Sequence, residues 1–207
     1  MLDRYVAQVR LLLSSLPDIA NETVFALKSG TAINLFCRDM PRLSVDIDLT
    51  YLPVADHQSS LKDIDDSLDR IVAAIARRNS RVEARRAAGG GIADTRIMVS
   101  DGQSQLKIET SPGARGAMYP AQTMTASEAV MELFGFVATT VPAFDDLYGG
   151  KLHAALVRQH PRDLFDIMLL DVNEGLTADL FRTFMVYVAS SGRPMHELLA
   201  PAAPLRV

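Results

Sequence analysis

Residues 44–49 alternate strictly between polar and apolar side chains, a pattern that favours an extended strand. In order they are Ser44, Val45, Asp46, Ile47, Asp48 and Leu49. Because successive strand side chains point to opposite faces, the apolar residues share one face and both carboxylates share the other. The chain is therefore predicted to contain a half-buried sheet that carries a pair of acids.

Asp46 and Asp48 are two strand residues apart, which corresponds to about 6.6 Å along a strand. Side chains at this spacing can converge on one divalent cation, and the repulsion between two neighbouring anions favours its binding. A pair of metal ions at such a site can hold a triphosphate and lower the pKa of an attacking hydroxyl. The alternative is a strand end with two solvated aspartates, since a motif this short matches freely.

The segment before the acids has the order of a phosphate-binding turn. An apolar run over residues 24–27 is typical of a buried strand, and after a turn at Gly30 a helix over residues 31–37 is predicted to open on a Thr31 cap. Gly30 lets the backbone approach a phosphate, and the hydroxyls of Ser29 and Thr31 add donors to the free amides of the helix start. By itself the turn is more simply an ordinary capped connection; its place before the acids favours phosphate binding.

A hairpin is predicted around Asp101-Gly102, between two alternating segments. In the second segment, residues 104–110, Lys107 and Glu109 share the face opposite the apolar residues. Pairing of this strand with the central sheet would place Glu109 beside the acid pair, as a third metal ligand. The alternative is a cross-strand Lys–Glu pair on the surface.

Two blocks of the sequence resemble one known family. The first is Phe-Ala-Leu-Lys-Ser-Gly-Thr-Ala-Ile-Asn-Leu-Phe at residues 25–36, followed by Arg-Leu-Ser-Val-Asp-Ile-Asp-Leu at residues 42–49. The second is Asp-Leu-Tyr-Gly-Gly-Lys-Leu-His-Ala-Ala-Leu at residues 146–156, followed by Arg158 and by Pro-Arg-Asp-Leu-Phe-Asp-Ile at residues 161–167. Together they are similar to the AbiEii/AbiGii nucleotidyltransferase-like toxin family, which belongs to the DNA polymerase β superfamily.

The resemblance implies an α+β fold, in which a polymerase β-like mixed sheet with flanking helices is followed by a helical lobe. It implies a metal-dependent enzyme that transfers a nucleoside monophosphate from an NTP to an acceptor, with two Mg²⁺ ions or, alternatively, Mn²⁺. The acceptor that it favours is the 3′ end of tRNA, with a protein or small-molecule acceptor as the alternative. It also implies a cognate antitoxin, in a bacterial toxin–antitoxin or phage-defence system.

The resemblance also assigns roles to individual residues. The metal ligands are Asp46, Asp48 and Glu109, and the catalytic residues are Asp46, Asp48, Lys151, Asp163 and Asp166. The nucleotide is assigned to Ser29, Gly30, Thr31, Ser44 and Lys151. Without the resemblance, Lys151 reads as an exposed helix lysine and the two later aspartates as residues of a helix start.

One position departs from the family pattern. The family usually carries two glycines before the threonine of the turn, whereas this chain has Ser29-Gly30. This departure leaves open a second class of protein, a nucleotide-binding module that has lost turnover. Such a module would bind NTP without transferring any part of it.

A group of arginines is the best sequence candidate for contact with RNA. Its members are Arg77, Arg78, Arg81, Arg85 and Arg86, at and beyond the end of a helix predicted over residues 58–79. The net charge of −4 argues against a generic nucleic-acid coat, so any RNA contact must be local. The alternative is a solvated helix end whose arginines complement the helix dipole.

Length and composition favour a single catalytic unit with two lobes. A chain of 207 residues with 48% hydrophobic content can bury a sizeable core. The lobes are predicted as a sheet lobe over residues 1–124 and a helical lobe over residues 125–207, because helical spacing begins at Thr125 and no later strand is evident. No apolar run approaches the roughly 20 residues of a membrane span, and the lone Cys37 fits a reducing cytoplasm.

Overall fold

The computed structural model describes residues 2–87 and 95–200, which form two compact units. The sheet unit contains the residues up to Ala117 together with Ala121–Val141. The helical unit contains Met118–Pro120 and the residues from Pro142 onward. The chain therefore passes briefly into the helical unit, returns, and finally leaves the sheet unit after Val141.

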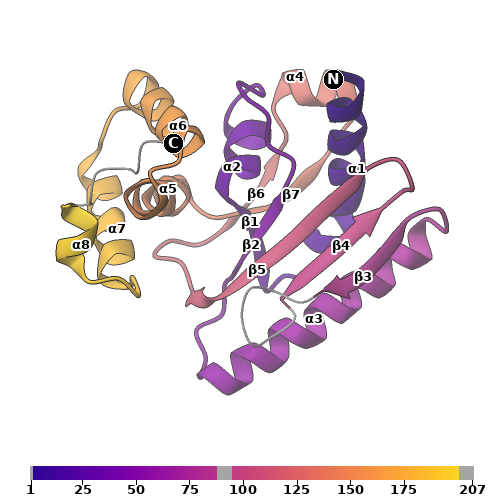
Figure 1. The fold of residues 1–207 in the computed structure, drawn as a ribbon, viewed down its shortest axis with the longest axis horizontal. Helices are drawn as coiled ribbons and strands as arrows, with labels where there is room; N and C mark the ends of the chain where they lie inside the picture. Colours follow the sequence, from indigo (N-terminus) through magenta and orange to yellow (C-terminus); the bar gives the residue numbers. More distant parts are fainter. Residues whose placement is uncertain (1, 88–94, 201–207) are drawn as a thin grey trace. The chain divides into compact units, whose positions relative to one another are not determined.

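The sheet unit is built on five strands in the order β1-β2-β5-β4-β3 (Figure 1). The strands are β1 (Phe25–Lys28), β2 (Ile47–Tyr51), β3 (Glu83–Ala87), β4 (Arg96–Ser100) and β5 (Gln105–Arg115). Strands β2 and β5 are parallel, and all other neighbours in this sheet are antiparallel. The predicted mixed sheet and α+β fold class are confirmed.

Alternating apolar side chains fill the covered face of this sheet. Ile47, Leu49, Ile97, Val99, Leu106 and Ile108 are all buried. Two helices, α1 (Leu2–Ala20) and α3 (His57–Arg78), pack against the sheet and against each other, and α3 runs alongside β3 (Figure 1). Asp56 caps α3 by accepting a hydrogen bond from the Ser59 amide. The polar residues that alternate with the apolar set, the acids among them, lie on the opposite face.

The connection between β1 and β2 begins with a helix that starts two residues earlier than predicted. Helix α2 (Ser29–Ala32) follows β1 directly and continues into a π-helical turn, η1 (Ile33–Cys37). Thr31 lies inside this helix, so the prediction that it caps the helix start is wrong. Its hydroxyl instead donates to the carbonyl oxygen of Asp46, because that acceptor lies beside the turn in the folded chain.

A second small sheet lies where only helix was predicted. Strands β6 (Gln122–Thr125) and β7 (Ala138–Val141) pair in antiparallel fashion around α4 (Glu128–Phe134), and β7 packs on α1 and β1. The boundary expected after residue 124 is therefore displaced to Val141. Over only four residues the alternation of apolar and polar side chains cannot be recognised in the sequence. Such short strands form because another strand pairs with them.

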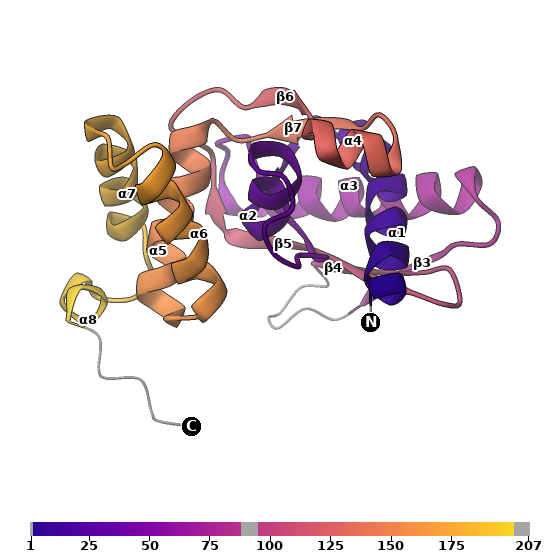
Figure 2. The ribbon, with the colours of Figure 1, turned by 90° about the horizontal axis from the view of Figure 1, so that it is seen from above.

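Four helices form the described part of the helical unit, residues 118–120 and 142–200, and they are drawn in Figure 2. They are α5 (Phe144–Arg158), α6 (Pro161–Asn173), α7 (Ala178–Ala189) and α8 (Met195–Leu199). Gly149 allows α5 and α7 to approach closely, since a methyl group there would lie 3.0 Å from Thr183 Cγ2. Pro161 begins α6 as predicted. Within residues 2–87 and 95–200, no helix combines the length and apolarity needed to cross a bilayer.

Candidate active site

The predicted acid pair lies at the start of β2. Asp46 immediately precedes the strand and is exposed, whereas Asp48 lies within it and is half-buried. Burial raises the pKa of Asp48; the charge of Lys28 opposes this rise and the charge of Asp46 adds to it. The two carboxylates are therefore close enough to repel each other, which is the electrostatic condition for binding a cation.

Strand pairing brings further charged residues to the acid pair. Asp48 is the register partner of Lys28 on β1 and of Glu109 on β5. Glu109 thus lies directly beside Asp48, where the sequence predicted a third acid. Its role as a metal ligand stays a prediction.

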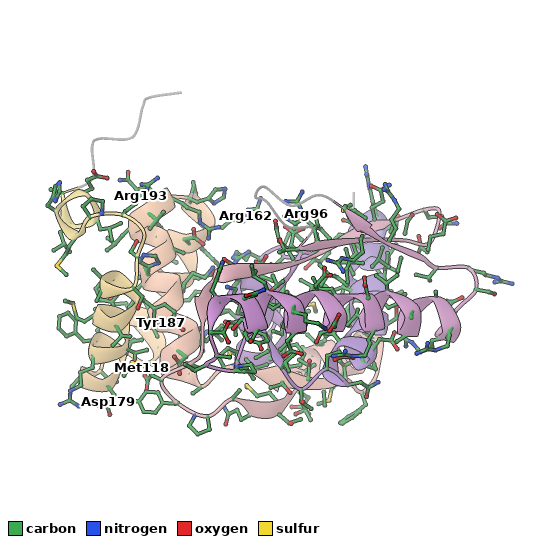
Figure 3. The ribbon with its side chains drawn as sticks, turned by 90° about the horizontal axis from the view of Figure 1, so that it is seen from below. Arg96, Met118, Arg162, Asp179, Tyr187 and Arg193 are labelled. Atoms are coloured by element: carbon green, nitrogen blue, oxygen red, sulfur yellow. The ribbon has the colours of Figure 1, made fainter. Side chains whose placement is uncertain are left out.

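The Glu109 carboxylate is held by two cations. Arg96 on β4, labelled in Figure 3, donates to Oε1 over 2.6 Å, and the Lys107 ammonium lies 2.9 Å from Oε2. Burial acts to raise the pKa of Glu109, but the hydrogen bonds from Lys107 and Arg96 outweigh it and lower the pKa. The Lys–Glu pair considered as an alternative is therefore present, although it runs along one strand, and the cross-strand partner of Glu109 is Arg96.

The glycine turn before the acids has an unusual backbone at Ser29. Its φ of 63° lies in the left-handed region that favours glycine, which is the residue the family usually carries there. Its side chain hydrogen-bonds to Asp48, which lowers the pKa of that carboxyl. The departure from the family pattern thus keeps the glycine-like backbone and adds a hydroxyl contact to the acid pair.

Gly30 lies against an arginine that sequence reasoning did not single out. A methyl group at Gly30 would lie 2.4 Å from Nη2 of Arg42 and 3.0 Å from Oγ of Ser44. No side chain fits there unless the guanidinium moves. The turn therefore carries a cation directly over its glycine.

Buried hydrogen bonds tie this turn to the acid-bearing strand. Thr31 Oγ1 donates to the Asp46 carbonyl oxygen over 2.5 Å and lies 3.0 Å from Ser44 Oγ. The fully buried Asn34 donates to the Gly30 carbonyl oxygen and accepts from the Arg42 amide. Neither Asn34 nor Arg42 was predicted, because their contacts join residues whose approach only the fold creates. The predicted nucleotide-binding residues of the turn are thus assembled beside the acids.

The donor chemistry of the acid pair suits a hard divalent cation. Asp46 and Asp48 supply only carboxylate oxygens, which Mg²⁺ and Mn²⁺ prefer. Among residues 2–87 and 95–200, no three His, Cys, Asp or Glu side chains are arranged to hold a metal ion. The structure therefore provides two fitting ligands, while the third predicted carboxylate is bound by cations of the protein.

A second charged group lies in the helical unit and is buried. The Lys151 ammonium is 3.0 Å from Oδ1 of Asp163 and 3.1 Å from Oδ2 of Asp166, and these three side chains are at most 4% exposed. Arg158 closes the group with a 2.9 Å contact to Asp163. Lys151, Asp163 and Asp166 are called the buried network below; the Arg158 side chain is 57% exposed. The alternative that Lys151 is exposed is therefore wrong. So is the alternative that Asp163 and Asp166 serve only the start of a helix.

Asp146 on α5 binds the short segment Met118–Pro120, which belongs to the helical unit. Its carboxylate accepts from the amides of Met118 and Tyr119, each over 2.9 Å, and from the Tyr187 hydroxyl over 3.3 Å (Figure 3). Burial, together with the charge of Asp146, raises the pKa of Tyr187. Sequence reasoning quoted Asp146 only as part of a motif, since its partners lie 27 or more residues away in the chain.

The five arginines proposed for RNA contact divide into two kinds. Arg78 is paired with Asp18 on α1, and Arg86 with Asp65 and Asp69 on α3. These two side chains therefore join elements of the sheet unit. The other three, Arg77, Arg81 and Arg85, are exposed.

Comparison with known proteins decides the family. The model of the nucleotidyl transferase AbiEii toxin family, of type IV toxin–antitoxin systems, matches residues 10–206. The chain belongs to the AbiEii family. The family expected from the two sequence blocks is confirmed, and with it membership among nucleotidyltransferases. AbiEii-type nucleotidyltransferases typically depend on a metal ion.

Two solved structures are similar to this chain. MenT4, a nucleotidyltransferase toxin from Mycobacterium tuberculosis H37Rv, is similar with a TM-score of 0.59 and 15% identity, over 89% of this chain and 67% of MenT4. The antibiotic-resistance factor ANT(2'')-Ia aligns with a TM-score of 0.47 and 15% identity, over 89% of this chain and 91% of the other. No curated protein matches the sequence. Because the sequence identity to MenT4 is only 15%, its structural similarity supports the α+β fold alone.

Proposed function

We propose that this AbiEii-family protein transfers a nucleoside monophosphate from an NTP to the 3′ end of tRNA. One observation carries the proposal: the hydrogen bond from Thr31 to the Asp46 carbonyl oxygen joins the glycine turn to the acid pair. A turn suited to phosphate and a pair of carboxylates suited to a divalent ion then form one site. Both parts of a nucleotidyltransferase reaction, triphosphate binding and metal binding, are thereby supported.

In this proposal the turn binds the triphosphate. Ser29, Gly30, Thr31 and Ser44 are the proposed nucleotide-binding residues. A hydrogen bond from the Thr31 or Ser29 hydroxyl to a phosphate oxygen would replace the bond that it makes here to the Asp46 carbonyl oxygen or to Asp48. Arg42 adds a guanidinium over the glycine, and guanidinium groups bind phosphate through paired hydrogen bonds. The contact between Arg42 and Gly30 supports a positive turn even though the chain has a net charge of −4.

Asp46 and Asp48 would hold Mg²⁺, or Mn²⁺ in its place, as two ions with further ligands from the nucleotide. When bound, these ions lower the pKa of the acceptor hydroxyl and neutralise charge on the leaving pyrophosphate. The acceptor oxygen forms a bond to the α-phosphorus of the NTP, and the bond from that phosphorus to the pyrophosphate oxygen breaks. The carboxylates of the chain fix where this exchange occurs.

Lys151 is assigned to the triphosphate by family resemblance. Asp163 and Asp166 both contact its ammonium, so we propose that they act by positioning Lys151 rather than by contacting substrate. An ammonium fixed by two carboxylates is preorganised, which is the condition for stabilising charge that develops during transfer. This assignment remains an inference from the family pattern.

We also propose tRNA as the acceptor, a cytoplasmic site of action and a cognate antitoxin, and membership of the toxin family supports these proposals. The exposed Arg77, Arg81 and Arg85 are the proposed RNA contacts, whereas Arg78 and Arg86 are proposed to serve the fold. A protein or small-molecule acceptor is the second candidate. A catalytically inactive nucleotide-binding module is the third, and the Ser29 departure from the family pattern leaves it open.

The test is to incubate the purified protein with Mg²⁺, labelled NTPs and total tRNA, with Asp48→Asn as the matched control. We expect label on tRNA with wild type and none with the variant. Label on protein or on a small molecule would support the second candidate. Binding of NTP without transfer to any fraction would contradict the enzyme and support the inactive module.

A further inference from the structure

The charges around the acid pair are balanced by the protein itself. Three carboxylates and three cations meet here within the described residues, and we call this group the carboxylate cluster. Its members are Asp46, Asp48, Glu109, Lys28, Arg96 and Lys107. A site whose acids were kept only for metal would carry a net negative charge until the metal bound. This cluster has no such excess, which raises the question of what its cations do.

Lys107 has the central position among these cations. In the parallel ladder Ile108 pairs with Ile47 and Glu109 with Asp48, so Lys107 lies level with Asp46 on the same face of the sheet. Its hydrogen bond to Glu109 raises the pKa of Lys107, burial opposes this, and the charges of Asp46, Glu109 and Asp48 add to the rise. The ammonium is therefore attracted by all three acids at once.

Lys107 is also able to move. Its side chain is 33% exposed, and a lysine stem has four rotatable bonds that end in a compact charge. Arg96 pairs with the same Glu109 carboxylate from the neighbouring strand β4, through a planar guanidinium rather than a compact ammonium. The planar guanidinium therefore holds Glu109 in place, while the ammonium can exchange one anion for another.

We propose that Lys107 is the resident counterion of Asp46 and Asp48 in the nucleotide-free protein, and that it transfers to a phosphate of the NTP when metal binds. This inference rests on the proposed metal role of the acid pair. Glu109, clamped by Arg96, keeps Lys107 within reach of both positions. Metal alone then binds weakly, because it must displace a tethered cation, whereas metal that arrives with a triphosphate provides the anion that Lys107 needs.

The competing explanation is that Lys107 and Glu109 form an ordinary surface ion pair. Exposed pairs of this kind contribute little, and their removal has no specific effect on ligands. The two explanations differ in what loss of the Lys107 charge does to nucleotide binding. Under the proposal it strengthens metal binding without nucleotide and weakens nucleotide binding with metal, whereas under the alternative nucleotide binding is unchanged.

The experiment measures Mn²⁺ binding by calorimetry and by electron paramagnetic resonance, without nucleotide. We expect Lys107→Gln to bind Mn²⁺ about tenfold more tightly than wild type, as expected when one nearby positive charge is removed from a partly solvated site. Lys107→Arg, which keeps the charge, should bind like wild type. Lys62→Gln is the matched control, since Lys62 is exposed and paired with Asp66 on α3.

A second measurement uses a non-hydrolysable NTP with Mn²⁺, where Lys107→Gln should bind the nucleotide about tenfold more weakly than wild type. Unchanged or weaker Mn²⁺ affinity in Lys107→Gln without nucleotide overturns the inference, even if wild type transfers nucleotide normally. Failure of the proposed function looks different. In that case Asp46→Asn and wild type bind Mn²⁺ equally, and wild type labels no acceptor.

Discussion

The carboxylate cluster on the sheet and the buried network in the helical unit contain the same kinds of group in opposite environments. In the cluster, Asp46 is exposed and the Lys107 side chain is 33% exposed. In the network, the side chains of Lys151, Asp163 and Asp166 are at most 4% exposed. Exposure therefore separates ion pairs whose charges remain partly solvated from ion pairs whose charges depend on each other for stabilisation.

The difference follows from the cost of desolvating a charge. A charge that loses its partner near water is solvated again, so the loss is small. A buried charge that loses its partner keeps its desolvation cost with nothing to offset it. Substitutions in the network should therefore act first on stability, and substitutions in the cluster should act first on ligands and turnover.

Lys151→Ala should give the largest effect, because it leaves two buried carboxylates without the ammonium that both contact. We expect a loss of about 3–5 kcal/mol in the free energy of unfolding, measured by urea denaturation. Lys62→Ala, at an exposed ion pair, should change it by about 0.5 kcal/mol or less. The triple change Lys151→Met, Asp163→Asn and Asp166→Asn should recover much of the loss. If Lys151→Ala unfolds at the same urea concentration as wild type, the buried network does not differ from the carboxylate cluster in this way.

Asp48→Asn tests whether a substitution in the carboxylate cluster affects turnover rather than stability. We expect kcat to fall about 10²- to 10³-fold, because one charged group of the reaction site is lost. Stability at pH 7 should not fall, since the variant removes a charge whose burial, together with repulsion from Asp46, raises the Asp48 pKa. Parallel assays of nucleotide transfer and urea unfolding check both statements. If Asp48→Asn unfolds as readily as Lys151→Ala, the two regions do not differ as argued.

The pH dependence of Asp48 gives a sharper form of the same test. Its pKa in the folded protein is raised above the ordinary value of 3.8, so the folded state binds its proton more tightly. The stability that Asp48 contributes through this proton is fully present below pH 3.8 and is lost as the pH rises through the pKa of Asp48 in the folded protein. The stability of wild type relative to Asp48→Asn should therefore decline from pH 3.5 to pH 7 in metal-free buffer. A difference that increases with pH would contradict the raised pKa.

Gly30→Ala tests the rigid turn beside the cluster. The added methyl group meets the Arg42 guanidinium, and we expect a loss of about 1–3 kcal/mol in stability. Combined with Arg42→Ala, the same change should cost less, because the obstacle is gone. A double-mutant cycle on urea unfolding measures this coupling. Strict additivity would show that the two residues are not in contact in solution.

Ser29→Gly should give the smallest effect and has the opposite sign. Glycine adopts the positive φ of this position without strain, although it loses more chain entropy on folding. We expect a gain of about 1 kcal/mol in thermal or urea unfolding. Loss of the hydroxyl contact to Asp48 should lower nucleotide affinity only slightly. A destabilised variant would mean that this contact outweighs the backbone strain.

Local sequence determined the elements whose signal is contained within them. The alternation at residues 44–49, the Asp101-Gly102 hairpin and the long helix near residues 58–79 all appear within a few residues of their predicted positions. Each depends on periodicity or on turn residues, which need no distant partner. The same holds for the start of α6 at Pro161.

Tertiary structure alone decided which partners these residues have. Strand β7 exists because β6 pairs with it, Glu109 is neutralised because Arg96 and Lys107 lie beside it, and Lys151 is buried because α6 carries two aspartates to it. Charge compensation and burial are properties of neighbours that are distant in the chain. A sequence therefore determines which groups are available to bind and react, whereas the fold decides which of them are already occupied.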